Sequence, residues 1–293
     1  MRIGAFEISE PLPEFKEPHV LVNLRPWIDV GSVGTLTLSG LETRLGAQEI
    51  GKLARPGNFY DFTRYRPMTY YVEGERQVSL PNTTISYARK ETGHDFLFFH
   101  LLEPNLHGED FTDSILLLLK QFGVKRYCSL GSMYDMVPHT RPLLVTGGGV
   151  GEGAEVVRKK LGLSPSRYEG PTSITFLVSQ GAVSMGIETV SLMVHLPQYA
   201  EVNEDYAGVV RIMETLRLLY DFPVDEADIS KAEQQKRDID AAVGRNAQLK
   251  GIIAQLEAHY DKQRAKKEEE EMPRLSPEIE KFLGEMDRRF RQG

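Results

Sequence analysis

Polar side chains of the types used in catalysis and ligand binding fall in short segments that follow predicted strands. Carboxylates and histidines can transfer protons, and the arginine guanidinium can hold an anion. Because loops beyond the carboxyl ends of parallel strands line a common crevice, we expect these side chains to converge there. The candidate ligand or partner crevice consists of Asp29, Glu103, Asn105, Asp135, His139, Arg141, Tyr168 and Glu169.

Motifs of common enzyme classes are absent from the sequence. It contains no HExxH pair, no GxSxG elbow and no P-loop ending in GK[ST]. Glycines 147–149 precede a predicted helix, where backbone amides could cradle an anion, but Glu152 and Glu155 would repel phosphate. A flexible connector is the competing interpretation. We therefore expect no catalytic residue, no metal and no cofactor.

The segment around His139 and Arg141 has two interpretations. In the first, prolines stiffen the loop and Arg141 forms an ion pair with Asp135 or Glu169 across two loops. In the second, Arg141 binds an anionic group and His139 transfers a proton near neutral pH. His195, at the end of a predicted strand, is expected to be a hydrogen-bonded residue at the edge of the core.

The elements that must position these side chains alternate between strands and helices. Apolar runs predict strands at residues 19–24, 95–101, 126–130, 143–146 and 189–195. Apolar stripes at helical spacing predict helices at residues 35–45, 110–122, 151–161, 173–185 and 203–220. The alternation predicts an α/β fold, a three-layer α/β/α sandwich with a mostly parallel central sheet.

Local signals refine these elements. Ser32 is expected to cap the helix at 35–45, and Asn203 the helix at 203–220. Gly131 is expected to end the strand that begins at Arg126, with an exposed loop from residue 133 to 142. Two runs on either side of Gly74 predict a β-hairpin, which we expect to decorate the main sheet.

Composition narrows the class of protein. The chain has 293 residues and a formal net charge of -7, and an acidic surface argues against nucleic-acid or anionic-membrane binding. Cys128 is the single cysteine, so no intrachain disulfide and no CxxC metal site can form. The sequence shows no signal peptide and no apolar run long enough to span a bilayer. We expect a soluble, cytoplasmic protein.

Charge density divides the chain into two expected domains, residues 1–224 and a helical extension at residues 225–293. About two fifths of the extension is charged, against about one fifth of the preceding part. Between Ile239 and Tyr260 apolar residues alternate at spacings of three and four, with Asn246 at an a position. This pattern predicts a short coiled coil. A last helix is expected at residues 276–290, after Pro273.

Several segments together carry a resemblance to a known family. They are Trp27-Ile28-Asp29, Phe59-Tyr60-Asp61-Phe62, Arg66-Pro67, Thr83-Thr84-Ile85-Ser86-Tyr87, Glu103-Pro104-Asn105, Val137-Pro138-His139-Thr140-Arg141-Pro142, Ser166-Arg167-Tyr168-Glu169-Gly170-Pro171-Thr172, Val190-Ser191-Leu192 and Leu196-Pro197. In this order, over roughly residues 1–222, the chain resembles the PAC2 family, named after proteasome assembly chaperone 2.

The resemblance implies an α/β/α fold similar to that of nucleoside phosphorylases, often assembled as homo-oligomers such as trimers. Eukaryotic members of the family are chaperones that help build the proteasome α-ring, and archaeal relatives bind proteasomes through a C-terminal hydrophobic-Tyr-any tripeptide. This chain ends Phe290-Arg291-Gln292-Gly293 and lacks that tripeptide. Family members also carry the label ATP-grasp, but no glycine-rich nucleotide loop or Mg²⁺-ligand pattern accompanies it here.

Three hypotheses follow for function. The first is a non-enzymatic, oligomeric protein-binding or assembly-chaperone-like factor. The second is a small-ligand binder or enzyme, nucleoside phosphorylase-like or an ATP-dependent ligase, that uses the strand-end crevice. The third places the function in the C-terminal helices, as a surface for another protein. The expected partners are other copies of the chain and possible protein clients, not nucleic acid or a membrane.

Overall fold

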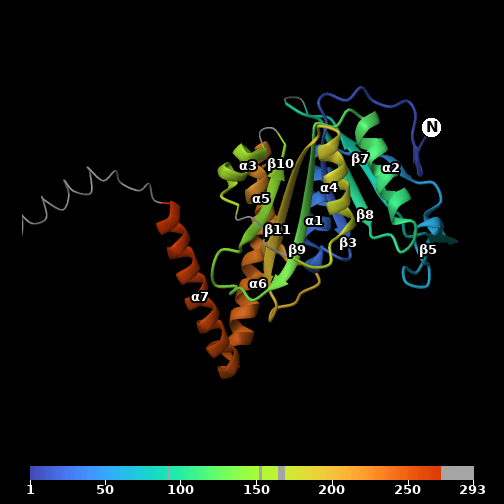
Figure 1. The fold of residues 1–293 in the computed structure, drawn as a ribbon. Coiled ribbons are helices and arrows are strands. Elements are labelled where there is room, and N and C mark those ends of the chain that lie inside the picture. Colours follow the sequence, from blue (N-terminus) through green and yellow to red (C-terminus); the bar gives the residue numbers. More distant parts are fainter. Residues whose placement is uncertain (91–92, 152–153, 164–168, 272–293) are drawn as a thin grey trace, which may run out of the picture. The chain divides into compact units, whose positions relative to one another are not determined.

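A nine-stranded sheet forms the centre of the protein in a computed structural model that describes residues 1–90, 93–151, 154–163 and 169–271 (Figure 1). The strands lie in the order β1-β2-β4-β7-β8-β3-β9-β11-β10. Their bounds are β1 Arg2–Ile3, β2 Phe6–Ile8, β3 His19–Arg25, β4 Gln48–Leu53, β7 Thr84–Ala88, β8 Phe96–Leu102, β9 Arg126–Asp135, β10 Val145–Val150 and β11 Glu188–Pro197.

The sheet is mixed, which corrects the expectation of a mostly parallel sheet. Parallel pairing is confined to the four central strands, in the pairs β8–β3, β3–β9 and β9–β11. All the outer pairings are antiparallel. The connection from Ala88 in β7 to Phe96 in β8 is too short for the crossover that parallel neighbours need, so these two strands must be antiparallel.

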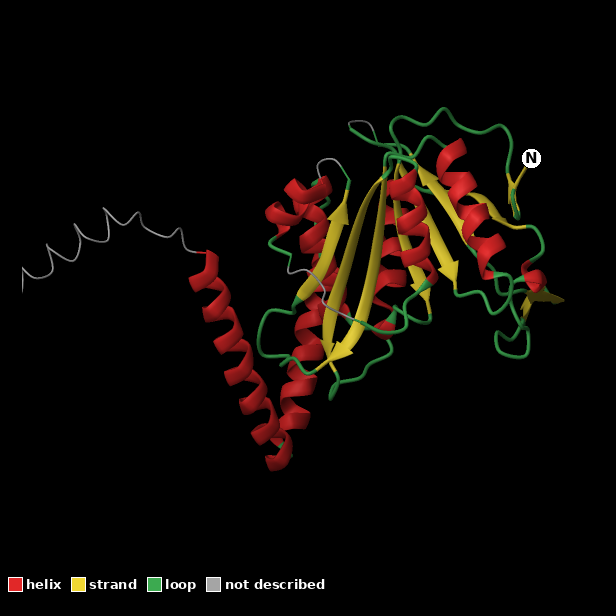
Figure 2. Cartoon of the chain, in the orientation of Figure 1, coloured by secondary structure: helices red, strands yellow, loops and turns green. Residues whose placement is uncertain are grey.

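Helices cover both faces of the sheet, as the sequence predicts for an α/β fold (Figure 2). Their bounds are η1 Val30–Ser32, α1 Val33–Leu45, η2 Pro56–Asn58, α2 Gly108–Gln121, α3 Ala154–Leu161, α4 Ile174–Ser184, α5 Tyr206–Tyr220, α6 Glu226–Gly244 and α7 Ala247–Glu271. Helices α2 and α4 share one apolar core with β3, β8 and β9, and α1 and α5 share the other. The likeness to nucleoside phosphorylases stays a prediction.

Strand β9 continues past Gly131, where the sequence pattern predicted its end. The strand pairs with β11 along its whole length, from Arg126 to Asp135. Gly131 is tolerated there because it is packed against Met193, whose Cε would lie 2.7 Å from a Cβ at that position. The glycine therefore marks close packing of side chains within the strand, and Asp135 ends the strand instead of lying in a loop.

The glycine cluster at 147–149 is an edge strand and not a loop. It forms half of β10, which pairs antiparallel with β11. Gly147 has a φ of 156°, and a Cβ there would collide with the carbonyl oxygen of Ser191. Because its backbone groups face β11 in the ladder, the cluster is not the anion cradle or flexible connector considered from the sequence.

Two helix caps differ from the expected ones. Ser32 has a left-handed backbone and makes no side-chain capping bond to α1. Helix α5 begins at Tyr206, and its cap is Asp205, whose carboxylate accepts from the Gly208 amide at 2.7 Å. Asn203 lies before the helix begins. Capping residues of similar type stand close together here, and only the backbone geometry selects among them.

The predicted hairpin forms, but it does not join the main sheet. Strands β5 (Met68–Val72) and β6 (Glu75–Ser79) pair with each other as a separate two-stranded sheet. Every residue of both strands is exposed. Since an isolated two-stranded hairpin is marginal in water, this segment differs from the rest of the domain.

The chain divides into two compact units between Asn246 and Ala247. Helix α6 packs against α5 inside the first unit, and the domain boundary at residue 224 stays a prediction. The second unit contains α7. Arg245 and Asn246 leave the helical conformation, so the heptad pattern does not lie on one continuous helix and Asn246 does not occupy an a position. The helix expected at 276–290 lies outside the described residues. None of the described helices is long and apolar enough to cross a membrane.

Candidate functional site

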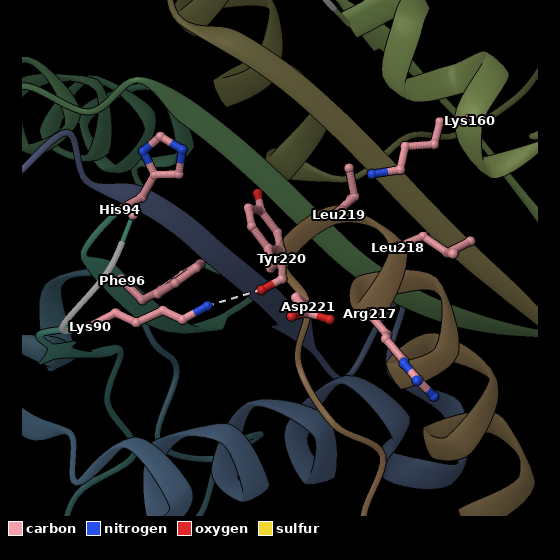
Figure 3. Close-up of a pocket in the computed structure, with 10 residues that line it drawn as sticks. Lys90, His94, Phe96, Lys160, Arg217, Leu218, Leu219, Tyr220 and Asp221 are labelled. Carbon is pink, nitrogen blue, oxygen red and sulfur yellow. Dashed lines mark hydrogen bonds between the residues drawn. The ribbon is translucent and has the colours of Figure 1, made fainter.

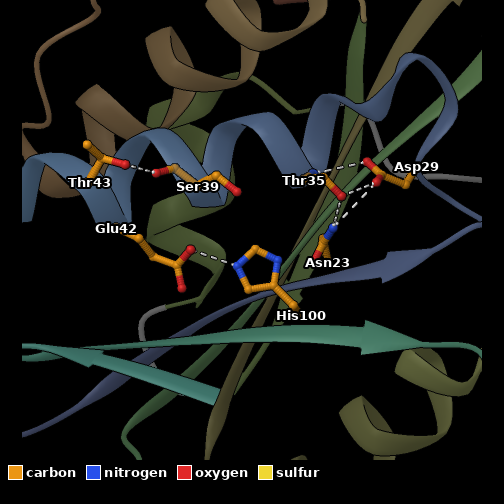
Figure 4. Close-up of polar contacts among 7 residues, drawn as sticks. All are labelled: Asn23, Asp29, Thr35, Ser39, Glu42, Thr43 and His100. Atoms are coloured by element: carbon orange, nitrogen blue, oxygen red, sulfur yellow. Dashed lines mark hydrogen bonds and ion pairs between the residues drawn. The ribbon is translucent and has the colours of Figure 1, made fainter. Parts of the chain in front are cut away.

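Asp29 lies after β3 and holds the beginning of helix α1 (Figure 4). Its Oδ1 accepts from the backbone amides of Gly34 at 2.7 Å and Thr35 at 3.2 Å. Its Oδ2 accepts from the hydroxyl of Thr35 at 2.6 Å and from the amide group of Asn23 at 3.5 Å. The carboxylate thus supplies the cap that was expected from Ser32.

Burial raises the pKa of the Asp29 carboxyl, and the hydrogen bonds from Thr35 and Gly34 partly oppose that rise. The side chain is surrounded by groups of its own β3–α1 connection. Toward the C-terminal end of α1, Nε2 of His100 on β8 lies 2.9 Å from a carboxylate oxygen of Glu42. This second polar pair ties the helix to the sheet (Figure 4). Asp29 therefore has a structural role that accounts for its environment.

Glu103 follows β8 at the carboxyl end of the parallel strands. Its amide donates to the Arg25 carbonyl at 2.8 Å, and its own carbonyl accepts from the Tyr65 hydroxyl at 3.0 Å. Burial raises the pKa of its carboxyl, opposed by a hydrogen bond from the backbone of Ile174. The Oε2 atom is buried without a hydrogen-bond partner. Of the described candidates, Glu103 therefore keeps an unused acceptor.

Asn105 closes the turn that follows Glu103. Its side-chain oxygen accepts from the Asp61 amide at 3.0 Å, and its backbone amide donates to the Phe59 carbonyl at 2.9 Å. These bonds fix the Phe59–Asp61 segment on the edge of the domain. A cavity of about 500 Å³ adjoins them, lined by Gly57, Tyr60, Asp61, Phe62, Arg64, Asn105 and Leu106.

Asp135 forms part of a hydrogen-bonded chain across three strands. Its Oδ2 lies 2.7 Å from Nδ1 of His195, and Nε2 of His195 lies 2.7 Å from the hydroxyl of Thr146. The order carboxylate, imidazole, hydroxyl is that of hydrolase triads. However, the three residues stand on the adjacent strands β9, β11 and β10, and sheet register alone brings them together. The chain ties the edge strand β10 to the sheet.

Sequence reasoning placed Asp135 and His195 near strand ends but did not pair them, and it missed Thr146. The available signal was the alternation of side chains along a strand, in which every second residue points to the same face of the sheet. Using it required the pairing of β9 with β11, since Asp135 lies opposite Pro197. That register is a property of the tertiary structure.

His139 links the loop before β10 to helix α6. Its amide and its Nδ1 both contact the Tyr199 hydroxyl, at 2.7 and 2.6 Å, and its Nε2 lies 3.0 Å from Oδ1 of Asp240. The His139 side chain is only 6% exposed, whereas that of Asp240 is 51% exposed. Both ring nitrogens are thus engaged with neighbouring protein groups, and α6 is held to the domain by a residue of the predicted crevice.

The remaining candidates add little to a common site. The amide of Arg141 lies 3.5 Å from the Pro138 carbonyl, and an ion pair of Arg141 with Asp135 or Glu169 stays a prediction. Glu169 is exposed, and Tyr168 lies outside the described residues.

The described candidates belong to separate local networks. No hydrogen bond joins any two of Asp29, Glu103, Asn105, Asp135 and His139 within the part of the chain that the structure describes. Nor does that part contain a group of three or more histidine, cysteine, aspartate or glutamate side chains suited to a metal ion. The polar groups of these candidates are therefore used in hydrogen bonds within the protein, and they are not arranged around a common reaction centre.

The hairpin offers a different kind of site, which sequence reasoning treated only as decoration. Six apolar side chains are exposed on it: Met68, Tyr70, Tyr71, Val72, Val78 and Leu80, here called the hairpin surface. Tyr71 is 72% exposed and Met68 66% exposed. The sequence signal was the run of apolar and aromatic residues in β5, whose side chains alternate between the two faces of the hairpin, whereas β6 is mostly polar with Val78 as its one apolar residue. Clustered exposure of this kind is typical of surfaces that bind other proteins.

Comparison with solved structures finds the same fold in proteins that match over nearly their whole length. A protein of unknown function from Corynebacterium glutamicum has a TM-score of 0.78 and 22% identity, over 89% of this chain and 99% of the other. A proteasome-assembly chaperone homologue from Mycobacterium tuberculosis has a TM-score of 0.71 and 24% identity, over 80% and 99%. PbaB, an archaeal proteasome activator from Pyrococcus furiosus, has a TM-score of 0.62 and 15% identity, over 81% and 97%.

No curated protein matches the sequence significantly. The sequence model of the PAC2 family, in contrast, matches residues 24–243, which is most of the chain and runs from the end of β3 through β8, β9 and β11 to the last turn of helix α6. This agrees with the motifs around Trp27, Phe59, Glu103 and His139, whereas nothing supports the ATP-grasp label. The chain belongs to the PAC2 family.

Proposed function

We propose that this protein is a protein-binding, assembly-chaperone-like factor that holds a client subunit against the hairpin surface. The observation that carries the proposal is that every residue of β5 and β6 is exposed, including the apolar side chains of Tyr71 and Val78. Removing apolar side chains from water contributes about 25 cal/mol per Å², so covering this hairpin would stabilise a complex.

The hairpin also has backbone groups to offer. β5 and β6 pair only with each other in the described structure, so the outer edge of each strand is available to an added strand of a client. Apolar side chains on both faces give such an added strand neighbours to pack against. Arg76 and Glu75 supply opposite charges at the turn end, which would help fix orientation.

Family membership and two neighbours support the identity of the client. One neighbour is described as a proteasome-assembly chaperone homologue and another as a proteasome activator. We take the client to be an α-type subunit of a proteasome-like ring. Assembly of the protein itself as a homo-oligomer, such as a trimer, a second protein contact through the C-terminal helices, and a cytoplasmic location belong to the same proposal.

The strand-end crevice provides weaker support for an enzyme. Asp29, Asp135 and His139 are each bonded to neighbouring protein groups at 2.6–3.0 Å, which leaves no free pair of acid and base among them. No specific observation favours a phosphorylase-like or ligase reaction.

The test uses affinity capture from the native cell with quantitative mass spectrometry. The double variant Tyr71→Ser, Val78→Ser removes apolar area from the hairpin surface. Leu117→Ser, an exposed leucine on α2, is the matched control. We expect the wild type and the control to enrich ring subunits, and the hairpin variant to lose at least tenfold of that enrichment. Equal enrichment by all three proteins would remove the hairpin from the proposal.

A further inference from the structure

A second cavity lies at the opposite end of the central strands from the predicted crevice. It has a volume of about 650 Å³ and is formed where β8 begins, α5 ends and α3 passes nearby (Figure 3). Its lining consists of Lys90, Gly93, His94, Phe96, Lys160, Arg217, Leu218, Leu219, Tyr220 and Asp221. A volume of this size suits a small organic ligand.

The charge of the lining is unusual for this protein. Lys90, Lys160 and Arg217 supply three cations, and Asp221 is the only carboxylate among the lining residues. The chain as a whole carries a formal net charge of -7. None of the three cations forms an ion pair with a carboxylate of the described chain. Among the described lining residues, three cations thus face one carboxylate, and the cavity is locally positive on an acidic molecule.

Two of these cations approach the cavity from different sides. Figure 3 shows Lys90 and Lys160 on either side of Tyr220, each with its ammonium directed toward the middle of the group. The Lys90 ammonium donates to the Tyr220 carbonyl at 3.0 Å and lies 5.3 Å from the centre of the Phe222 ring. An ammonium group has three donors, so Lys90 is held in place and still has N–H groups to offer.

The wall between the cations is rigid and partly apolar. Phe96 and Tyr220 are almost completely buried, whereas Leu218 is half exposed. Asp221 adopts a left-handed backbone with φ of 57°, and its amide donates to the Arg217 carbonyl at 2.9 Å, which fixes the end of α5. A ligand that combines an anionic group with an apolar ring would match both parts of this lining.

A pair of histidines beside the cavity also supports a ligand site. His19, only 3% exposed, stacks on His94 with ring centres 3.9 Å apart; Nδ1 of His19 has no hydrogen-bond partner among the described residues, whereas Nδ1 of His94 lies 3.9 Å from a carboxylate oxygen of Glu17. Burial, followed by the charges of His94 and Arg126, lowers the pKa of His19 to about 3, so this ring is neutral at physiological pH. A buried polar atom without a partner calls for an explanation, and a polar ligand in the adjoining cavity would supply one.

We infer that this cavity binds a phosphorylated small molecule, with the phosphate drawn to the lysines Lys90 and Lys160 and an apolar ring against Phe96 and Leu219. Phosphate is favoured over a simple carboxylate because two lysines face the cavity from different sides and a phosphate carries up to two charges. The site lies at the amino ends of β3 and β8, away from the hairpin surface and the carboxyl-end loops, and does not depend on the proposed function.

Isothermal titration calorimetry at low salt tests the inference on the full chain. Adenosine 5′-monophosphate is the probe, with adenosine and inorganic phosphate as its two halves. We expect the monophosphate to bind, and each half to bind at least tenfold more weakly. No heat from the monophosphate, or equal affinity for adenosine, would overturn the inference of a phosphate site. Equal affinity for inorganic phosphate would overturn the role of the apolar wall.

Charge-reversed variants locate the binding. Lys160→Glu should weaken binding of the monophosphate at least tenfold, whereas Lys159→Glu, on the same helix but outside the cavity lining, should change it less than twofold. Equal losses in both variants would show that the probe responds only to general surface charge, and would overturn the site. Circular dichroism confirms folding, and Lys160→Gln replaces the glutamate variant if that variant does not fold.

Discussion

The charged side chains at the two ends of the central strands differ in how many partners they have within the protein. At the carboxyl ends, Asp29, Asp135 and His139 are bonded to neighbouring groups of the protein. At the amino ends, Lys90, Lys160 and Arg217 line a cavity and form no ion pair with a carboxylate among the described residues. At the end that fold-level reasoning nominates for chemistry, Asp29, Asp135 and His139 are thus satisfied and the buried Oε2 of Glu103 is an exception, whereas at the other end three cations stand without such pairs. A clustering of polar residues is therefore weaker support for a site than unsatisfied polar groups beside a cavity.

The largest expected effect is at Asp29. Replacing it with alanine removes the cap of α1 and leaves Thr35 and Asn23 without their acceptor, so we expect a loss of about 2–3 kcal/mol in unfolding free energy. Urea denaturation measures it. Asp61→Ala, which removes an exposed turn carboxylate, is the control and should cost clearly less. An unaffected midpoint for the Asp29 variant would return this carboxylate to the list of free ligand groups.

A smaller loss is expected at His139. The alanine variant breaks the contacts to Tyr199 and Asp240, and we expect a cost of about 1–2 kcal/mol together with faster proteolysis of α6. Asp240→Asn changes only an exposed partner and should cost less than about 0.5 kcal/mol. Asp238→Asn, on the same helix and bonded to Gln234, serves as the control. Unchanged proteolysis of α6 in the His139 variant would contradict the proposed link.

Glu103 gives a pH-dependent effect. Burial raises the pKa of its carboxyl, so its contribution to stability is fully present below the unfolded pKa and is lost as pH rises through the folded pKa. Glu103→Gln removes this titration. The variant should therefore gain stability relative to the wild type as pH rises from 4 to 7. Thermal unfolding across this range checks the prediction, and a difference that does not vary with pH would show that folding leaves the pKa of Glu103 unchanged.

The smallest effect is expected at the amino-end cavity. Lys160→Gln should leave the unfolding free energy within about 0.5 kcal/mol of the wild type, because the exposed lysine has no ion-pair partner among the residues that the structure describes. The same urea titration measures this. A loss comparable to that of Asp29→Ala would mean that Lys160 is a structural residue, and would remove the contrast between the two ends.

Much of the fold was predictable from the sequence. Apolar runs located β3, β8 and β11, and helical stripes located α1, α2 and α5, because burial on a sheet or a helix face imposes a fixed period. The hairpin around Gly74 was also predicted correctly, since turn chemistry is local. The short outer strands β1, β2, β4 and β7 were not predicted, because their few residues carry too little periodic signal.

The candidate site stays a prediction, for a physical reason. The sequence identifies which side chains have chemical potential, but not which neighbours have already satisfied them. Asp29 took the capping role expected of Ser32, and the glycines of β10 proved to be a strand, because both outcomes depend on contacts between distant segments.

By itself, the sequence determined the alternation of buried strands and helices, the PAC2 family and the acidic character of the chain. Only the tertiary structure decided that the outer strands run antiparallel, that Asp135 meets His195, and that three cationic residues line one cavity. Periodicity is written along the chain, whereas strand register and the pairing of charges arise only when residues far apart in sequence are brought within a few ångströms.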